Sequence, residues 1–259
     1  MREQEKAIEV SKLTVSYEKT LALWDLTFSV DRGRLMGIIG PNGAGKSSLL
    51  QALLGMVKPF SGQVLFYGRS FKEGRRRIAY IPQKGSIDWN FPITVFDVVL
   101  MGRYGHLRGL KWYRKRDRMA AYQVLQNLGM ESLAHRQIDE LSGGQQQRLF
   151  IARALLQEAD IFLLDEPFSG IDKSTEHVVI EILKRLKAEG KTLLVVHHDL
   201  HTVKKYFDSV LILKTALVAC GEIEKTFTSD NLDRAFDSIS DFLKEVASAS
   251  PSVVQKVEK

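Results

Sequence analysis

The chain has 259 residues, of which 44% are hydrophobic and 26% charged, a composition typical of a globular protein. One cysteine, Cys220, excludes an internal disulfide and fits a reducing compartment. No window reaches the ~18 apolar residues of a membrane-spanning helix, and the charged start is unlike a signal peptide. We therefore expect a soluble chain whose membrane role would go through a partner or the lipid surface.

The net charge is +6, and the densest basic runs are Arg75–Arg77 and Arg114–Arg116 with Arg118. A basic run is most often a solvated face, and contact with lipid or nucleic acid is the alternative. No basic region is interleaved with aromatic residues in the way of RNA-binding proteins, so we expect no nucleic-acid partner.

The first part of the chain reads as strands followed by a loop and a helix. Ile8–Tyr17 and Leu21–Val30 alternate apolar and polar residues, as half-buried strands do. The apolar run Leu35–Ile39 then leads into GPNGAGKSS, Gly40–Ser48, with a helix over Ser47–Met56. A strand, a glycine-rich loop and a helix in this order predict a phosphate-binding loop.

The loop matches the pattern G-x-x-x-x-G-K-[ST] in full. Its glycines let the backbone turn N–H groups toward phosphates, and the helix start adds positive potential. Lys46 is expected to reach the phosphates of a nucleotide, and the hydroxyl of Ser47 to bind Mg²⁺. A plain glycine turn is the alternative, which the preceding strand disfavours. The predicted nucleotide-binding positions are Gly40, Pro41, Asn42, Gly43, Ala44, Gly45, Lys46, Ser47 and Ser48.

The middle of the chain reads as a helical insertion. Ile78–Ile81 is a short strand, but 83–129 contains no strong strand pattern. Arg114–Leu128 is predicted as an amphipathic helix that Gly129 ends. A further helix starts near Gly143 within LSGGQQQR.

The third part alternates buried strands and helices, which predicts an α/β core with a parallel sheet. Ile161–Leu164 and Thr192–Val196 read as strands, and Lys173–Glu189 as a helix. Asp172 and Asp199 are the expected N-caps of this helix and of the next short helix. Val210–Leu213 and Leu217–Ala219 read as a closing hairpin, 222–247 as weakly helical, and 248–259 as disordered.

Two adjacent carboxylates follow the strand Ile161–Leu164 in the run IFLLDEP. Asp165, at the strand end, is expected to hold Mg²⁺ through water, and Glu166 to polarise the attacking water. A surface turn is the alternative, which the complete phosphate loop disfavours.

The phosphate loop followed by LSGGQ resembles the ATP-binding cassette of the ABC superfamily, and the match runs from about Lys6 to about Gly221. The resemblance implies a P-loop NTPase fold: a RecA-like parallel-sheet core, an N-terminal antiparallel β subdomain and an inserted helical subdomain. It places the ATP-binding domain at 1–225, the helical subdomain at about 84–150 and a C-terminal helical segment with a flexible tail at 226–259. No second cassette is present in the sequence.

The same resemblance implies roles for residues outside the phosphate loop. LSGGQ closes over the ATP of a second copy, which implies a homodimer. Gln83 contacts Mg²⁺ and the attacking water, and SGID, ending at Asp172, links the two active sites. The residues implied in this way are Tyr17 (stacking on adenine), Gln83, Ser142, Gly143, Gly144, Gln145, Asp172 and the switch histidine His198.

Some of these residues have a purely structural alternative. Ser142 can serve as a helix N-cap, and Tyr17 can be a strand residue of the core or an edge. The family usually has a small hydroxyl residue before the switch histidine, where this chain has His197. We assign the switch role to His198 because it directly precedes Asp199, and a metal site in HHDLH is disfavoured.

A finer resemblance lies in Ser86–Gly105, with DEPFSGID downstream, which looks like the ATPases of manganese, zinc and iron importers. It implies an ATPase at the cytoplasmic face of the inner membrane, driving permease subunits served by an extracytoplasmic metal-binding protein. The alternatives are import of another small substrate, a soluble ABC ATPase of iron–sulfur assembly, and a nucleic-acid ATPase. A nucleic-acid ATPase of this superfamily usually has two cassettes or long coiled coils, and this sequence shows neither. Four aromatic residues form either a socket for a partner's helix or ordinary core: Trp89, Phe91, Phe96 and Tyr104.

Overall fold

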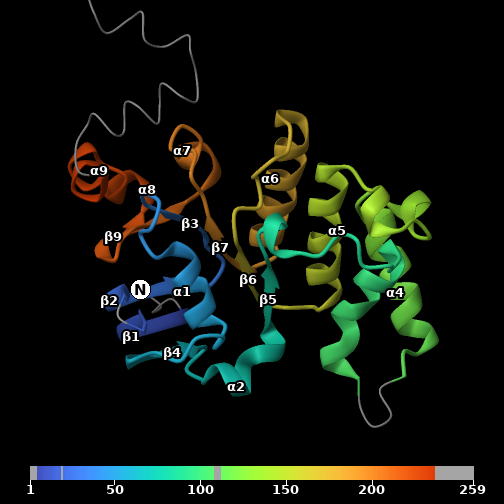
Figure 1. The fold of residues 1–259 in the computed structure, drawn as a ribbon, viewed down its shortest axis with the longest axis horizontal. Coiled ribbons are helices and arrows are strands. Elements are labelled where there is room, and N and C mark those ends of the chain that lie inside the picture. The colour runs from blue at the N-terminus through green and yellow to red at the C-terminus, as the bar shows by residue number, and fades with distance from the viewer. Residues whose placement is uncertain (1–4, 19, 108–111, 237–259) are drawn as a thin grey trace, which may run out of the picture. The chain divides into compact units, whose positions relative to one another are not determined.

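The structure is a computed structural model that describes residues 5–18, 20–107 and 112–236 (Figure 1). The described residues of Met1–Phe71 and Leu194–Lys259 form one compact unit, and Lys72–Leu193 forms a second. No helix in the described ranges is both long and apolar enough to cross a membrane. The tail predicted at 248–259 lies outside the described residues.

The first unit begins with an antiparallel sheet. Strand β1 (Lys6–Tyr17) pairs with β2 (Thr20–Asp31), where Val10 faces Phe28. On its other side β1 pairs antiparallel with β4 (Ser61–Phe66). The predicted strands are therefore confirmed, and apolar side chains of both are buried, with regular alternation in the second half of β2.

The rest of the first unit is built on short apolar strands. β3 (Leu35–Ile39) runs parallel to β8 (Ser209–Lys214), which forms an antiparallel hairpin with β9 (Ala216–Glu222). The strand order in this unit is β4-β1-β2-β9-β8-β3-β7, with β7 at Thr192–Val196. Every residue of β3 and β7 is buried, which explains why both read as continuous apolar runs.

The described part of this unit also contains four short helices: α1 (Lys46–Leu53), α7 (Val203–Tyr206), α8 (Ile223–Thr226) and α9 (Ser229–Phe236). The last two fall in the stretch predicted as weakly helical.

The expected helix cap at Asp199 is wrong. The N-cap of α7 is Thr202, and the carboxylate of Asp199 accepts a hydrogen bond from the backbone N–H of His201 at 3.0 Å. Asp199 thus closes a turn that precedes the helix, a use that competes with capping for this residue type.

The second unit holds a parallel strand pair and a long helix. β5 (Ile78–Ile81) runs parallel to β6 (Ile161–Leu164), with Ala79 opposite Phe162. Helix α6 (Lys173–Ala188) begins at the N-cap Asp172, as predicted. These strands, with the parallel pair β3–β8, confirm the predicted α/β class with an antiparallel N-terminal sheet.

The second unit also contains a helical cluster around α3 (Val95–Leu100), α4 (Lys115–Asn127) and α5 (Gly143–Leu156), in green to yellow in Figure 1. Its buried side chains include Val99, Leu125 and Leu149. Helix α4 matches the predicted one, and Gly129 follows it with φ of 63°. Short helices connect the elements of this unit: α2 (Phe71–Gly74), η1 (Arg75–Arg77), η2 (Lys84–Ser86), η3 (Met101–His106), η4 (Glu131–Leu133) and η5 (Ile138–Glu140).

The four aromatic residues considered as a socket divide into two pairs. Phe96 is buried in the helical cluster, and Trp89 packs edge-on against Phe150 with ring centroids 5.6 Å apart. Phe91 and Tyr104 expose 57% and 56% of their surface. Phe96 is therefore part of the core and Trp89 is partly buried against that core, whereas the second pair lies mainly on the surface.

Candidate functional site

The phosphate loop lies between β3 and α1, and its backbone requires glycine at its two ends. Gly40 and Gly45 have φ of 154° and 93°. A Cβ at Gly45 would lie 2.5 Å from the carbonyl oxygen of Ala22, and one at Gly40 would lie 2.1 Å from that of Leu213. The loop therefore passes so close to two neighbouring strands that neither position has room for a side chain.

Lys46 is folded back onto its own loop. Its side chain is buried, and Nζ donates to the carbonyl oxygens of Gly40 at 2.7 Å and Pro41 at 2.9 Å. The ammonium group is therefore held inside the turn of the loop, while Ser47 at the first turn of α1 is exposed. A fixed positive charge at a helix start is a favourable place for an anion.

Tyr17 is tied to the helix that follows the loop. Its hydroxyl donates to Oε1 of Gln51 on α1 at 2.9 Å, and 40% of the residue is exposed. The ring therefore does not belong to the core of the first unit, and a flat exposed ring can stack on a base.

The two histidines after β7 have different environments. His198 is exposed, whereas His197 is 2% exposed and its Nε2 lies 2.7 Å from Oγ1 of Thr202. Among the residues that the structure describes, no group of three or more His, Cys, Asp or Glu is arranged to hold a metal ion.

In the second unit, Asp165 and Glu166 follow the fully buried strand β6. The backbone N–H of Asp165 donates to the carbonyl oxygen of Ile81 at 2.9 Å, which carries the parallel pairing to the strand end. Asp165 is buried. The pKa of Tyr80 is raised, mainly because the phenol is partly buried and in addition because the negative charge of Asp165 is near it.

Glu166 contacts Gln83 directly. The side-chain amide Nε2 of Gln83 donates to Oε2 of Glu166 at 2.9 Å. Glu166 also has φ of 48°, a left-handed backbone that costs a non-glycine residue about 1–2 kcal/mol. Strain of this kind at a paired carboxylate is typical of functional sites.

The signature Ser142–Gln145 forms the start of α5. Ser142 is the N-cap: its hydroxyl accepts from the N–H of Gln145, whose side-chain oxygen accepts from the N–H of Ser142 at 2.9 Å. The structural alternative for Ser142 is therefore present in the fold. This reciprocal pair leaves the N–H groups of Gly143 and Gly144 at an ordered helix start.

Both signature glycines lie in close contact with neighbouring segments of the same unit. A Cβ at Gly143 would lie 3.1 Å from Nζ of Lys84, and one at Gly144 would lie 2.6 Å from Cγ2 of Thr175. The start of α5 thus lies beside Lys84, which follows Gln83, and beside Thr175 in the first turn of α6. Lys84 and Thr175 were not singled out from the sequence, because no local pattern marks such a contact.

Asp172 caps α6 with both carboxylate oxygens. Oδ1 accepts from the N–H groups of Ser174 at 2.9 Å and Thr175 at 3.0 Å, and Oδ2 accepts from the Thr175 hydroxyl at 2.8 Å. These bonds, led by that from the Ser174 hydroxyl, hold the pKa of Asp172 well below its usual range. Asp172 is therefore a charged cap across the neutral pH range.

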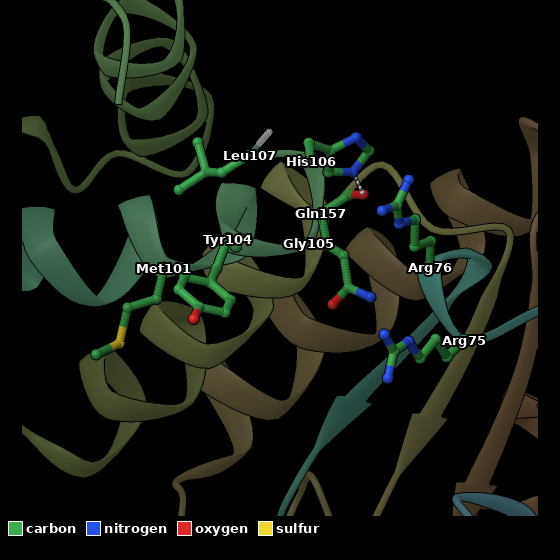
Figure 2. Close-up of a pocket in the computed structure, with 9 residues that line it drawn as sticks. Arg75, Arg76, Met101, Tyr104, Gly105, His106, Leu107 and Gln157 are labelled. Atoms are coloured by element: carbon green, nitrogen blue, oxygen red, sulfur yellow. Dashed lines mark hydrogen bonds between the residues drawn. The ribbon is translucent and has the colours of Figure 1, made fainter. Parts of the chain in front are cut away.

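A cavity of about 510 Å³ lies elsewhere in the second unit, between η1, η3 and the end of α5. Figure 2 shows Arg75 and Arg76 on one side, Met101 and Tyr104 on the other, and the His106 ring hydrogen-bonded to the carbonyl of Gln157 at 2.9 Å. No described carboxylate lies in ion-pair range of these two arginines.

The arginines around this cavity differ in their partners. Arg77, next in sequence, pairs with Asp160 at 2.7 Å, and Arg103 pairs with Asp117 at 3.3 Å. Two positive charges of the basic run thus stay available, beside an exposed aromatic ring and a thioether.

Comparisons with known proteins agree with this arrangement. A family model described as ABC transporter matches residues 23–169, more than half of the chain. The zinc transport system ATP-binding protein TroB of Treponema pallidum is 50% identical over 230 residues, covering 89% of this chain and 86% of that protein. The manganese transport system ATP-binding protein MntB of Bacillus subtilis is 49% identical over 238 residues, covering 92% and 95%.

Solved structures give the same fold. A transporter described as a metal-chelate type ABC transporter, in an inward-facing conformation, superposes with a TM-score of 0.80 at 32% identity, covering 90% of this chain and 89% of that one. The chain belongs to the ABC transporter family and is a nucleotide-binding subunit with ATPase activity. The predicted P-loop cassette fold is confirmed.

Proposed function

We propose that the chain is the ATP-hydrolysing subunit of an importer for a divalent metal ion. The relatives that share about half of its residues are named for zinc and manganese transport. The observation that carries the catalytic part is the hydrogen bond between Gln83 and the strained Glu166 at the end of β6.

On the nucleotide side, residues 40–48 bind the phosphates of ATP. The glycine-bounded backbone supplies N–H groups, and Lys46 supplies a charge already held inside the loop. Tyr17 offers an exposed ring beside α1 for the adenine.

Hydrolysis is assigned to Glu166 as the base. Its carboxylate takes the proton of a water whose oxygen attacks the γ-phosphorus, while the bond to the leaving ADP oxygen breaks. Gln83, bonded to the same carboxylate, orients that water, and His198 contacts the γ-phosphate.

The chemistry of the three residues proposed as metal ligands fits Mg²⁺. The side chains of Ser47, Gln83 and Asp165 present hydroxyl, amide and carboxylate oxygens, the hard ligands this ion prefers. Bound there with ATP, Mg²⁺ would offset negative charge on the phosphates.

The signature residues 142–145 are the basis for proposing a homodimer. Residues 142–145 form an ordered helix start with two glycine N–H groups, which suits an anion presented by another molecule. We therefore assign them to the ATP of a second copy, in a homodimer that Asp172 and its turn connect.

The permease subunits are the second partner. The cavity lined by Arg75, Arg76, Tyr104 and Met101 fits an acidic segment that also carries an apolar side chain. We assign it to a cytoplasmic segment of the permease, and we propose that this subunit lies at the inner face of the membrane. The extracytoplasmic metal-binding protein acts on this chain only through the permease.

Metal uptake tests the function. A strain lacking this protein should lose uptake of radioactive manganese or zinc, and the wild-type chain should restore it. The Glu166→Gln chain, expressed at the same level, should not. Unchanged uptake of both metals in the deletion strain would contradict the proposed substrate class.

Co-purification tests the permease contact. Arg75→Glu with Arg76→Glu should reduce the amount of permease that purifies with the tagged chain, because the substitutions reverse two charges in the cavity. Lys204→Glu with Lys205→Glu, an exposed pair in the other unit, is the matched control. Equal recovery of permease with both double variants would exclude this cavity.

A further inference from the structure

The buried residue His197 is placed beside the phosphate loop within the first unit. Its backbone N–H donates to the carbonyl oxygen of Ile38 on β3 at 3.0 Å, two residues before Gly40. The chain leaves the sheet immediately after this bond, so His198 is the first residue beyond it.

The ring of His197 is clamped by aromatic residues. Phe207 meets it edge-on with ring centroids 5.3 Å apart, and Tyr206 lies 6.0 Å away. Phe207 in turn lies on Gly37 of β3, where an added Cβ would come within 2.8 Å of the phenyl ring. The imidazole therefore has little freedom to turn.

The polar edge of the ring is used on Thr202. Nε2 of His197 lies 2.7 Å from Oγ1 of Thr202, which lies 3.1 Å from the carbonyl oxygen of Asp199. A hydroxyl has one proton and a carbonyl only accepts, so both bonds form together when Nε2 of His197 carries the donated hydrogen. The chain of bonds then runs from His197 through Thr202 to Asp199.

These contacts fix both neighbours of His198. On one side His197 is bonded to β3. On the other the carbonyl of Asp199 accepts from both the hydroxyl and the N–H of Thr202, the latter at 3.2 Å. His198 itself is exposed between these two anchored residues.

We propose that His197 is a positioning residue that holds the His198 ring in its working orientation through the hydrogen bond to Thr202. The inference rests on the proposed contact of His198 with the γ-phosphate. It predicts that kcat depends on a hydrogen-bond donor at the position of Nε2, and that another side chain with such a donor can replace the imidazole.

The test compares substitutions that keep or remove this donor. Glutamine places an amide N–H near the position of Nε2, and methionine has a similar length without a donor. In the full chain assembled with its permease, His197→Gln should keep kcat within about twofold, and His197→Met should lower it roughly tenfold or more. The Kd for ATP should change less than about twofold in both.

Thr202 gives an independent pair of variants with little change in volume. Thr202→Ser keeps the hydroxyl and should keep kcat, whereas Thr202→Val should lower it as His197→Met does. Equal kcat for Ser and Val variants that melt at the wild-type temperature would overturn the proposal.

A double-mutant cycle separates this inference from the role of His198. If His197 acts only through His198, His197→Met should lower kcat no further in a His198→Ala background. A further loss there would show an independent, structural effect and overturn the proposal. Wild-type kcat in His198→Ala alone would instead refute the assigned role of His198, and with it this inference.

Discussion

The phosphate loop and the carboxylate region are built in different ways. In the first unit, residues 40–46 are shaped by backbone: two glycines allow close approach of neighbouring strands, and Lys46 donates to two carbonyls of its own loop. In the second unit, side chains bond to side chains or cap helix ends, as Gln83 does with Glu166 and Asp172 does with Thr175.

The two regions should therefore tolerate different kinds of amino-acid substitution. A backbone-built site fails when a Cβ is added, because no rotamer relieves the clash. A side-chain-built site fails when a donor or acceptor is lost, while its backbone can stay in place. Binding and hydrolysis should therefore respond to different kinds of substitution.

The largest effect is expected from Glu166→Gln. Glutamine keeps the length and an oxygen that can accept from Gln83, but it is no longer a base. We expect kcat to fall by roughly 10²–10⁴-fold with ATP binding retained, so that an ATP-dependent dimer accumulates. Single-turnover hydrolysis and gel filtration with ATP measure the two parts.

Lys46→Ala is the opposite control for Glu166→Gln. It removes the charge held inside the loop, so the affinity for ATP should fall. Normal turnover in Glu166→Gln, or unchanged ATP affinity in Lys46→Ala, would contradict the separation of the two regions.

Much of the fold follows from local patterns in the sequence. Leu35–Ile39 and Ile161–Leu164 are apolar throughout because both faces are covered, and the glycine loop after the first marks the start of α1. Asp199 was misplaced because a carboxylate can close a turn or cap a helix with the same oxygen. Its choice depends on where Leu200–Thr202 turn, which no local pattern reports.

The site shows the same limit. Glycine spacing predicts the loop at 40–46, because its physical requirement lies within seven consecutive residues. The partners of Gly144 and Gln83 come from other parts of the chain, and the bond of His197 to Thr202, five residues on, depends on a turn, so all three contacts appear only in the fold. The resemblance to ABC cassettes singled out Gln83, and the adjacent carboxylates after a buried strand singled out Glu166, but neither pattern indicated the bond between them.

Two glycines of the loop provide a matched test of the backbone argument. Gly43 and Gly45 both have positive φ, but an added Cβ meets nothing within 4 Å at Gly43 and meets Ala22 and Leu23 at Gly45. Gly43→Ala should cost about 1–2 kcal/mol in unfolding free energy from backbone strain. Gly45→Ala should cost about 1–3 kcal/mol more from the clash. Equal urea midpoints would show that the strands adjust freely to the loop.

The smallest effect concerns the two helix starts. Helix α6 is capped by the carboxylate of Asp172, whereas α1 has Gly45 as its N-cap without a side-chain bond. Asp172→Ala should speed hydrogen exchange of the Thr175 N–H a few-fold and leave that of Leu49 in α1 unchanged.

Because the folded pKa of Asp172 is lowered, the cap's contribution is present above the unfolded pKa of about 3.9 and is lost only as pH falls through the folded value. Protection of Thr175, corrected for intrinsic exchange, should therefore be equal at pH 7 and at about pH 5 in the wild type. A loss of protection already between about pH 7 and 5 would mean that the Ser174 and Thr175 bonds do not hold the charged form, and α6 would then start as α1 does, from backbone alone.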